Sequence, residues 1–485
     1  MMARGLAHGL RRHIPETAGG AGLTQQRKLF FAIMGALLLG VGYIAYTQYA
    51  AGLYYLAGQY DRMMNPYGVD EDAPEPDARD RALHESLFVA DLHIDTLKWE
   101  RDLLERSYFG HADVPRLHEG NIALQVFTIV TRSPLNLPWQ TCVSGDSLDT
   151  NTALFFMQGR PVFGLRERAF YQIERFHEAA ERSRDTDGPE LRLIATADDL
   201  RQLVADRAVG RDVIGGIIGI EGAHWIGGDD VTGADVRADM EDLFEAGVRL
   251  FAPTHRFDNN LSGSNEGCER YGLTDHGFTA LSTAQELGMA VDLAHISSAG
   301  LANATAYLRQ PVTVSHTGIA EGCEAPCRPD RNLSDDDIRR IIDTDGVIGI
   351  GFWPQAIGPS VWRVADAMRH ITGIAAEMGV SEPSRHVAIG SDYDGSVTPM
   401  IEVTHLNVLT ALLRRGEEPF AEHHVRRIMG ANTCRLFGTV LPGGGTDTAE
   451  AICGPLAQPR PLEWTPDTDT ETPSLENDPE EDTEA

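Results

Sequence analysis

Lysine is nearly absent from this chain, which contains only Lys28 and Lys98. Schiff-base catalysis needs a lysine amine in the active site, so this scarcity disfavours such chemistry. Basic residues as a whole are outnumbered, because 41 Lys and Arg stand against 72 Asp and Glu and give a formal net charge of -31. Nucleic acid requires positive charge against its phosphates, and no basic stripe with interleaved aromatic residues occurs here, so no nucleic-acid partner is expected.

The chain does contain a regular alternation of short apolar runs and helix-like stretches. Eight runs rich in strand-forming residues follow residue 85, and most are separated by helix-like segments such as 234–246, 280–287 and 335–343. Eight rounds of this kind predict an α/β fold, the (β/α)8 barrel of the TIM type. The runs span residues 87–91, 122–130, 213–220, 248–253, 289–293, 311–315, 346–352 and 386–390.

Six of these runs are followed by side chains that can bind a metal or move a proton. The first run ends in D-L-H-I-D, and because side chains alternate along a strand, His93 and Asp95 project from the same face. A barrel gathers the carboxyl ends of its strands at one face, so residues far apart in sequence would converge there, as in a barrel metallohydrolase. The residues after the other five runs are Glu221, His255, His295, His316 and Asp392.

Each of these residues alone has a simpler explanation. A single histidine at a strand end is more often a hydrogen-bonded structural residue, and Glu221 before Gly222 is typical of a turn or helix cap. Six such positions after six different runs are hard to explain as independent accidents. His224 stays open, since it could support the site or merely pack. Other histidines in polar or helical contexts are expected to be solvated, namely His8, His13, His84, His177, His370, His405, His423 and His424.

Ordered motifs over about 350 residues, from Leu87 to Phe437, resemble those of the membrane dipeptidase (renal dipeptidase) family of zinc metallopeptidases. The motifs are D-L-H-I-D, H-A-D-V-P-R-L-H-E-G, G-I-E-G-A-H, L-F-A-P-T-H, L-T-D-H-G, V-D-L-A-H-I-S, V-S-H-T-G, D-R-N-L-S-D-D, G-S-D-Y-D-G and I-M-G-A-N. The resemblance implies two zinc ions per chain. It assigns His93 and Asp95 to one zinc, His295 and His316 to the other, and Glu221 as the bridge, and these ligand types suit zinc.

The same resemblance implies hydrolysis of dipeptides by a metal-bridging hydroxide. His255 would stabilise the oxyanion, Asp392 would handle the proton and the free amino group, and Arg331 would bind the substrate carboxylate. The family also implies tolerance of a C-terminal D-residue, and homodimers are common in it. One departure concerns residues 351–355, Gly-Phe-Trp-Pro-Gln, where animal members place a tyrosine near the substrate carboxylate. Asp394 is open, because it would face the site only if the last strand continues.

The two lysines also bear on the bridge between the metals. Many binuclear barrel hydrolases bridge their metals with a carbamylated lysine from a mid-barrel strand. Lys28 precedes the apolar N-terminal segment and Lys98 follows the first strand, so neither is placed to bridge. A carboxylate bridge is therefore favoured, with Glu221 as the candidate, and the urease-like and phosphotriesterase-like branches are disfavoured.

The N-terminus predicts a membrane anchor. No charged residue occurs from Leu29 to Tyr60, and 29–46 is almost wholly apolar, which is close to the length that spans a bilayer. Five basic residues precede this stretch against the single acid Glu16, so the N-terminus is expected in the cytoplasm and the catalytic domain outside. A cleaved signal peptide and a buried core helix are the alternatives.

The remaining segments complete the predicted organisation. It consists of a basic N-terminus (1–28), the anchor (29–50), a juxtamembrane linker (51–85), the barrel (86–440) and an acidic disordered tail (441–485), in which Arg460 is the only basic residue. The long connection 131–211 is expected to elaborate the barrel, with a helix near 165–184. The six cysteines form no C-x-x-C motif and do not make a metal site. Outside the cytoplasm some could pair, and we expect Cys323–Cys327 and Cys142–Cys268 in loops beside the barrel mouth.

Two other functions stay open at this point. One is a binuclear-zinc hydrolase of the same fold that acts on another small amide, lactone or ester. The other is an inactive anchored binding protein that has kept the barrel, whose mark would be a missing ligand residue, and none is missing from the sequence. Assays of dipeptides against N-acyl amino acids separate the first alternative from a dipeptidase.

Overall fold

The computed structural model describes residues 47–49, 51–68, 70–133, 142–143, 164–416 and 418–462. The chain divides into two compact units, residues 1–55 and 56–485. In the first unit, residues 47–49 and 51–55 are helical. The second unit contains all the elements discussed below.

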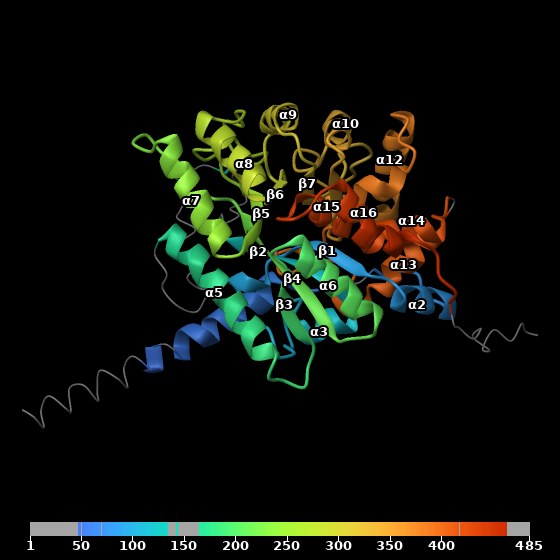
Figure 1. Cartoon of the computed structure of the whole chain (residues 1–485). Helices are drawn as coiled ribbons and strands as arrows, with labels where there is room; N and C mark the ends of the chain where they lie inside the picture. The colour runs from blue at the N-terminus through green and yellow to red at the C-terminus, as the bar shows by residue number, and fades with distance from the viewer. Residues whose placement is uncertain are drawn as a thin grey trace, which may run out of the picture. The chain divides into compact units, whose positions relative to one another are not determined.

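Eight parallel strands close into a barrel in the second unit (Figure 1). The sheet runs in the order β2-β1-β9-β8-β7-β6-β5-β4, and β2 also pairs with β4, which closes the ring. The predicted (β/α)8 fold is therefore confirmed, and each predicted run overlaps one strand. The strands are β1 (Val89–Ile94), β2 (Ile122–Val130), β4 (Val213–Glu221), β5 (Val248–Ala252), β6 (Ala290–Asp292), β7 (Val312–Thr317), β8 (Val347–Ile350) and β9 (Val387–Ile389).

Helices surround the strands and bury their apolar faces against them (Figure 1). Helix α10 illustrates why these segments are helical: Ser334 caps its N-terminus, and Ile338, Ile341 and Ile342 form one buried face. The strands are buried along their whole length, which explains their continuous apolar sequences. The main helices are α3 (Val114–Glu119), α5 (Leu165–Ser183), α7 (Gly233–Glu245), α8 (Asp275–Leu287), α9 (Ser298–Tyr307), α10 (Asp335–Asp343), α12 (Trp362–Glu377), α13 (Asn407–Arg414) and α15 (Asn432–Val440).

The long connection between β2 and β4 carries more structure than predicted. Helix α5 confirms the expected helix near 165–184. The connection also holds β3 (Glu190–Leu193), which pairs with the first residues of β4, and α6 (Ala197–Ala208), which begins with a capping box of Thr196 and Asp199. Strand β3 has only four residues and two of them are charged, so no apolar run marked it in the sequence.

The segment 51–85 is not a simple linker. Residues 56–64 are helical, and α2 (Ala78–Glu85) begins at a capping box formed by Asp77 and Asp80. Asp61 forms a buried ion pair of 2.6 Å with Arg101, and Arg414 of α13 pairs with Asp80. Residues 56–85 therefore belong to the barrel unit, because their carboxylates pair with arginines of later segments.

The predicted disordered tail begins too early. Helix α16 (Thr446–Cys453) and the short helix η5 (Gly454–Ala457) lie within the range assigned to the tail, and a disulfide joins Cys434 of α15 to Cys453. Ala449, Ile452 and Cys453 are buried. The composition of the whole segment concealed this short apolar face. Residues 463–485 lie outside the described residues.

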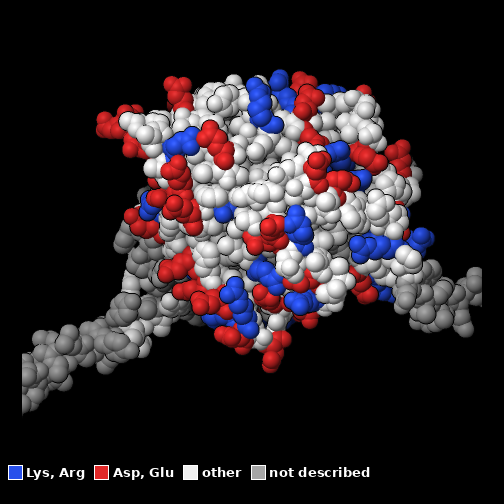
Figure 2. Space-filling view, in the orientation of Figure 1, with Lys and Arg blue, Asp and Glu red and all other residues white. Residues whose placement is uncertain are grey.

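The two predicted disulfides, Cys142–Cys268 and Cys323–Cys327, are confirmed. Of the predicted anchor, 29–50, only residues 47–49 are among the described residues. Among the described helices none has the length and apolarity needed to cross a bilayer. On the face seen in Figure 2, acidic and basic side chains are interspersed, and no extended basic patch covers this face.

Candidate metal centre

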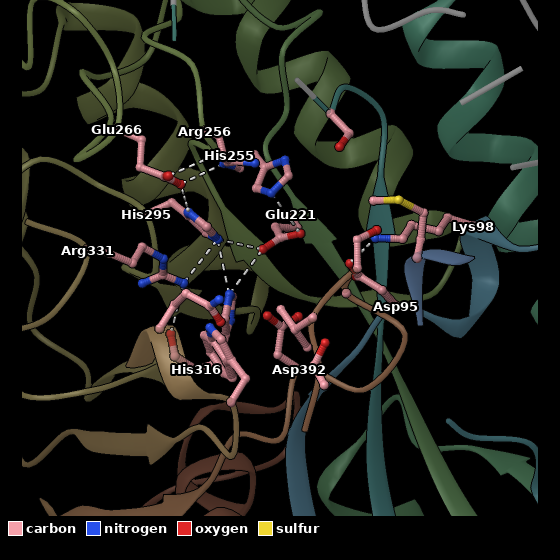
Figure 3. Close-up of a pocket in the computed structure, with 18 of the residues that line it drawn as sticks. Asp95, Lys98, Glu221, His255, Arg256, Glu266, His295, His316, Arg331 and Asp392 are labelled. Carbon is pink, nitrogen blue, oxygen red and sulfur yellow. Dashed lines mark hydrogen bonds and ion pairs between the residues drawn. The ribbon is translucent and has the colours of Figure 1, made fainter. Parts of the chain in front are cut away.

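The predicted residues converge at the carboxyl ends of the barrel strands (Figure 3). His93 and His316 lie within β1 and β7, and Glu221 is the last residue of β4. Asp95, His255, His295 and Asp392 follow their strands by one to three residues, and Arg331 lies in the loop between β7 and α10. All eight candidates are buried, with exposed fractions of 7% or less: His93, Asp95, Glu221, His255, His295, His316, Arg331 and Asp392.

Glu221 is at the centre of this cluster. Its Oε1 atom lies 3.0 Å from His295 Nε2, 3.4 Å from His316 Nε2 and 3.6 Å from His93 Nε2. The Nε2 atoms of His295 and His316 are 3.1 Å apart, and His93 Nε2 is 3.5 Å from Asp95 Oδ1. Ligands of a tetrahedral zinc at about 2.0–2.1 Å are separated by about 3.3 Å. The donor atoms therefore have the spacing that shared metal ions require.

Neighbouring polar groups orient the imidazoles so that their Nε2 atoms point inward. Ser315 Oγ lies 3.1 Å from His93 Nδ1 and 2.9 Å from His316 Nδ1. Thr128 donates a 2.7 Å hydrogen bond to Asp95 Oδ1. Contacts of this kind fix the ring orientation of a metal-binding histidine and leave its other nitrogen for the metal.

The backbone is strained at two of the candidate residues. His295 and Asp392 have φ angles of 62° and 58°, in the left-handed region that non-glycine residues rarely adopt. Gly222, directly after Glu221, has φ +82°, and a Cβ there would collide with His255. Because the glycine has no Cβ, the chain can pass close to His255 directly after Glu221, which explains the Glu-Gly pair.

The charges in this centre favour the binding of cations. Burial, together with the nearby Asp95 and Asp392, raises the pKa of Glu221 to about 8. Burial also lowers the pKa of His295 and His316 well below the ordinary value, so both imidazoles are neutral and can donate a lone pair. Although burial opposes it, Glu221 and Asp95 raise the pKa of His93 to about 9, so a metal would displace a proton there. Three imidazoles and two carboxylates fit a pair of divalent ions.

Lys98 is a member of the site that the sequence did not indicate. It is buried, lines the cavity, and its Nζ atom lies 2.8 Å from Asp95 Oδ2. It does not bridge the donor atoms, as expected. Although burial raises it, Lys98 and His93 hold the pKa of Asp95 below its usual range. Lys98 thus occupies one carboxylate oxygen of Asp95 and leaves Oδ1 facing His93.

Glu266 is a second residue that the sequence analysis missed. It accepts hydrogen bonds of 2.8 and 3.0 Å from Arg256 and one of 2.9 Å from Arg328, and its Oε2 atom is 3.6 Å from His295 Nδ1. Its partners are 10 to 62 residues away, so no local motif marks it. This carboxylate lies behind His295, where it can orient the ring.

A cavity of about 250 Å³ opens onto the centre. Arg331 lies on the side of His295, at 3.2 Å between Nη2 and Nε2, whereas Asp392 Oδ1 is 3.9 Å from His93 Nε2. His255 donates from Nδ1 to the Arg132 carbonyl at 2.9 Å and turns Nε2 toward Glu221 at 3.5 Å. In place of the tyrosine of animal family members, Trp353 and Gln355 line this cavity.

Three further residues considered in the sequence analysis, His224, Asp394 and His84, do not line the cavity. His224 is buried near Asn259 and packs on Phe257, and it does not line the cavity. The last strand ends at Ile389, so it does not continue as far as Asp394. The Asp394 carboxylate turns away from the site and pairs with Arg101 at 2.7 Å. His84 is buried, so its predicted solvation is wrong.

A parallel barrel with imidazoles and carboxylates gathered at the carboxyl ends of its strands defines the class of barrel metallohydrolases. The comparison with known sequences is more specific. The family model "Membrane dipeptidase (Peptidase family M19)" matches residues 77–442. The chain belongs to this family, and it is accordingly a metallopeptidase that acts as a dipeptidase.

Similar proteins agree with this assignment. The chain is 30% identical over 341 residues to Dipeptidase verJ of Clonostachys rogersoniana, an alignment that covers 68% of this chain and 76% of that protein. The fold is similar to the probable dipeptidase PvdM of Pseudomonas aeruginosa, with a TM-score of 0.55, 17% identity, and coverage of 76% and 98% of the two chains. It is also similar to a Rhodobacter sphaeroides metallopeptidase that was solved with a phosphinate mimic of L-Ala-D-Ala, with a TM-score of 0.52, 22% identity, and coverage of 73% and 99%.

Proposed function

We propose that this chain is a zinc-dependent dipeptidase that binds two zinc ions and hydrolyses free dipeptides, including those with a C-terminal D-residue. The observation that carries the proposal is the set of donor atoms around Glu221, at 3.0 to 3.6 Å from three imidazole nitrogens. His93 and Asp95 would hold one ion, His295 and His316 the other, with Glu221 between them. When bound, two such ions supply an activated water and polarise the scissile carbonyl.

Two residues of opposite charge support dipeptide length as the substrate limit. The Arg331 guanidinium, a planar fork suited to a carboxylate, borders His295, and the Asp392 carboxylate borders His93 at the other end of the centre. A substrate with a free carboxylate and a free amino group would contact both. A longer peptide would place uncharged backbone at one of these residues and lose that interaction.

Asp392 would also move the proton. Burial raises its pKa to about 7, with Asp95 adding to the effect and His93 opposing it. A carboxylate with such a pKa accepts and releases a proton near neutral pH. Asp392 would accept at Oδ1 the proton that the attacking water loses and pass it to the nitrogen of the departing residue, which leaves as a neutral amine.

His255 would stabilise the oxyanion of the tetrahedral intermediate. Its Nδ1 atom donates to the Arg132 carbonyl, so Nε2 is unprotonated when the ring is neutral, and burial lowers the pKa of His255 to about 3. Donation to an oxyanion therefore requires protonation of the ring. The negative charge that develops on the substrate favours this protonated form.

A substrate panel tests the proposal. We expect the wild-type protein to hydrolyse L-Ala-L-Ala and L-Ala-D-Ala but neither tri-alanine nor N-acetyl-alanine. Glu221→Gln should lose at least about 100-fold in kcat/KM, because the amide cannot bridge two cations. Glu245→Gln, an exposed position on α7, is the matched control and should be unchanged. Turnover of lactones, esters or N-acyl amino acids without dipeptide turnover would overturn the assignment.

The location of the catalytic domain is a separate proposal. We propose that residues 29–50 anchor the chain in a membrane with the catalytic domain on the periplasmic or extracellular side. The three disulfides support this proposal, since disulfides persist mainly in oxidising compartments. Protease should degrade the domain in cells whose outer envelope has been removed and whose plasma membrane is intact. Protection until the plasma membrane is lysed would contradict the proposal. The homodimer stays a prediction.

A further inference from the structure

Part of the cavity wall comes from outside the family domain. The family model begins at residue 77, yet Tyr60 and Met64 line the cavity together with the candidate catalytic residues. Both belong to the helical residues 56–64, which we call the 56–64 helix. A cavity residue contributed by a segment that the family model does not cover can give this chain a substrate preference of its own.

Buried polar contacts hold the 56–64 helix in place. Asp61 accepts a 2.6 Å hydrogen bond from Arg101, and Arg101 also pairs with Asp394 at 2.7 Å. Just after the helix, Asn65 accepts a 3.0 Å hydrogen bond from the backbone of Ser396, which lines the cavity. The helix is thus tied to the loop that carries Asp392, so its position relative to the site is fixed.

The helix faces the end of the site that contains Asp95 and Asp392. Tyr60 and Met64 pack against Trp99, and the Tyr60 and Trp99 ring centroids are 6.2 Å apart. Trp99 directly follows Lys98, which binds Asp95 at 2.8 Å. In the view of Figure 3, Lys98 and Arg331 lie on opposite sides of Glu221. Tyr60 and Met64 therefore adjoin the side of the cavity that holds Lys98 and Asp95, whereas the proposed carboxylate-binding arginine borders His295.

We propose that Tyr60 and Met64 form the pocket for the side chain of the substrate's N-terminal residue and make the enzyme prefer apolar residues there. This inference rests on the proposed function, which places the amino group at Asp392. A phenol ring and a thioether offer apolar surface, and burying an apolar substrate side chain against them is favourable. Glycine at that position would leave the same surface in contact with water.

The test compares kcat/KM for L-Leu-L-Ala and Gly-L-Ala, which differ only in the N-terminal residue. Wild type should prefer L-Leu-L-Ala, and Met64→Ala and Tyr60→Ala should each reduce this preference about tenfold. Met64→Leu retains the volume and should keep the preference. Met63→Ala is the matched control, because Met63 is on the same helix but 64% exposed, and its ratio should equal that of wild type.

Gly-L-Leu and Gly-L-Ala differ only in the C-terminal residue. The ratio of their kcat/KM values should be the same in Met64→Ala as in wild type. An unchanged N-terminal ratio in folded Met64→Ala and Tyr60→Ala, or a change confined to the C-terminal ratio, would overturn the inference. Failure of the proposed function would look different, because wild type would then hydrolyse none of the three dipeptides.

Discussion

At the scale of single residues, the chemistry of the centre was predictable where it coincides with the end of an apolar run. His93, Glu221 and His316 were found in this way, since a barrel must bring strand ends together. Lys98 and Glu266 were not found. Lys98 acts through a 2.8 Å contact with a residue three positions earlier, and Glu266 acts through arginines in two different loops. No periodicity marks such contacts.

The contact between Lys98 and Asp95 leads to a prediction. Lys98→Met keeps most of the side-chain length but removes the charge that holds Asp95 Oδ2. Asp95 would then be free to rotate, so kcat/KM or metal affinity should fall roughly 10- to 100-fold, as for other groups that orient metal ligands. Steady-state kinetics with titrated zinc measure both quantities. Lys98→Arg, which keeps the charge, should recover part of the loss, and full activity in Lys98→Met would contradict this role.

At the scale of elements, the strands of the barrel were predicted well because each is a continuous apolar run buried on both faces. The elements at the edges were not. Strand β3 is short and half charged, and α16 buries only three residues within a segment of acidic composition. In both cases the element is stabilised by a neighbour, β4 or α15, that a local reading of the sequence does not include.

The disulfide between α15 and α16 should contribute measurably to stability. Cys434 and Cys453 are 19 positions apart, and closing a loop of this size stabilises a protein by about 3 kcal/mol. The double variant Cys434→Ser/Cys453→Ser should therefore unfold at a lower urea concentration than wild type. The variant Cys323→Ser/Cys327→Ser, whose loop spans four positions, is the comparison and should lose less. Equal losses would contradict the loop-length argument.

At the scale of the whole molecule, the barrel buries neutral histidines as well as apolar residues. His84 is only 6% exposed, lies 2.9 Å from Thr410 Oγ1 and 3.2 Å from the Gly120 carbonyl, and connects α2 with α13 and the end of α3. Burial lowers its pKa from 6.5 to about 4. Its polar sequence neighbours suggested solvation, because the partners that enclose it are 36 and 326 positions away.

This burial predicts a loss of stability in acid. The unfolded chain protonates His84 near pH 6.5 and the folded chain only near pH 4, so stability is complete above pH 6.5 and falls as the pH drops toward 4. Between pH 7 and pH 5 the loss from this residue is about 2 kcal/mol. Urea unfolding at both pH values should show a smaller difference for His84→Gln than for wild type. His405→Gln, at an exposed position, should leave the difference unchanged.

The most direct test of the central claim is the metal content of the purified protein. If His93, Asp95, Glu221, His295 and His316 hold two ions with a shared carboxylate, wild type should contain two zinc ions per chain by mass spectrometry of the metal. Chelation should abolish dipeptide hydrolysis, and added zinc should restore it. Glu221→Gln should retain one zinc or fewer, whereas Glu245→Gln should retain two. Full dipeptidase activity in a metal-free protein, or two zinc ions and full activity in Glu221→Gln, would contradict the account.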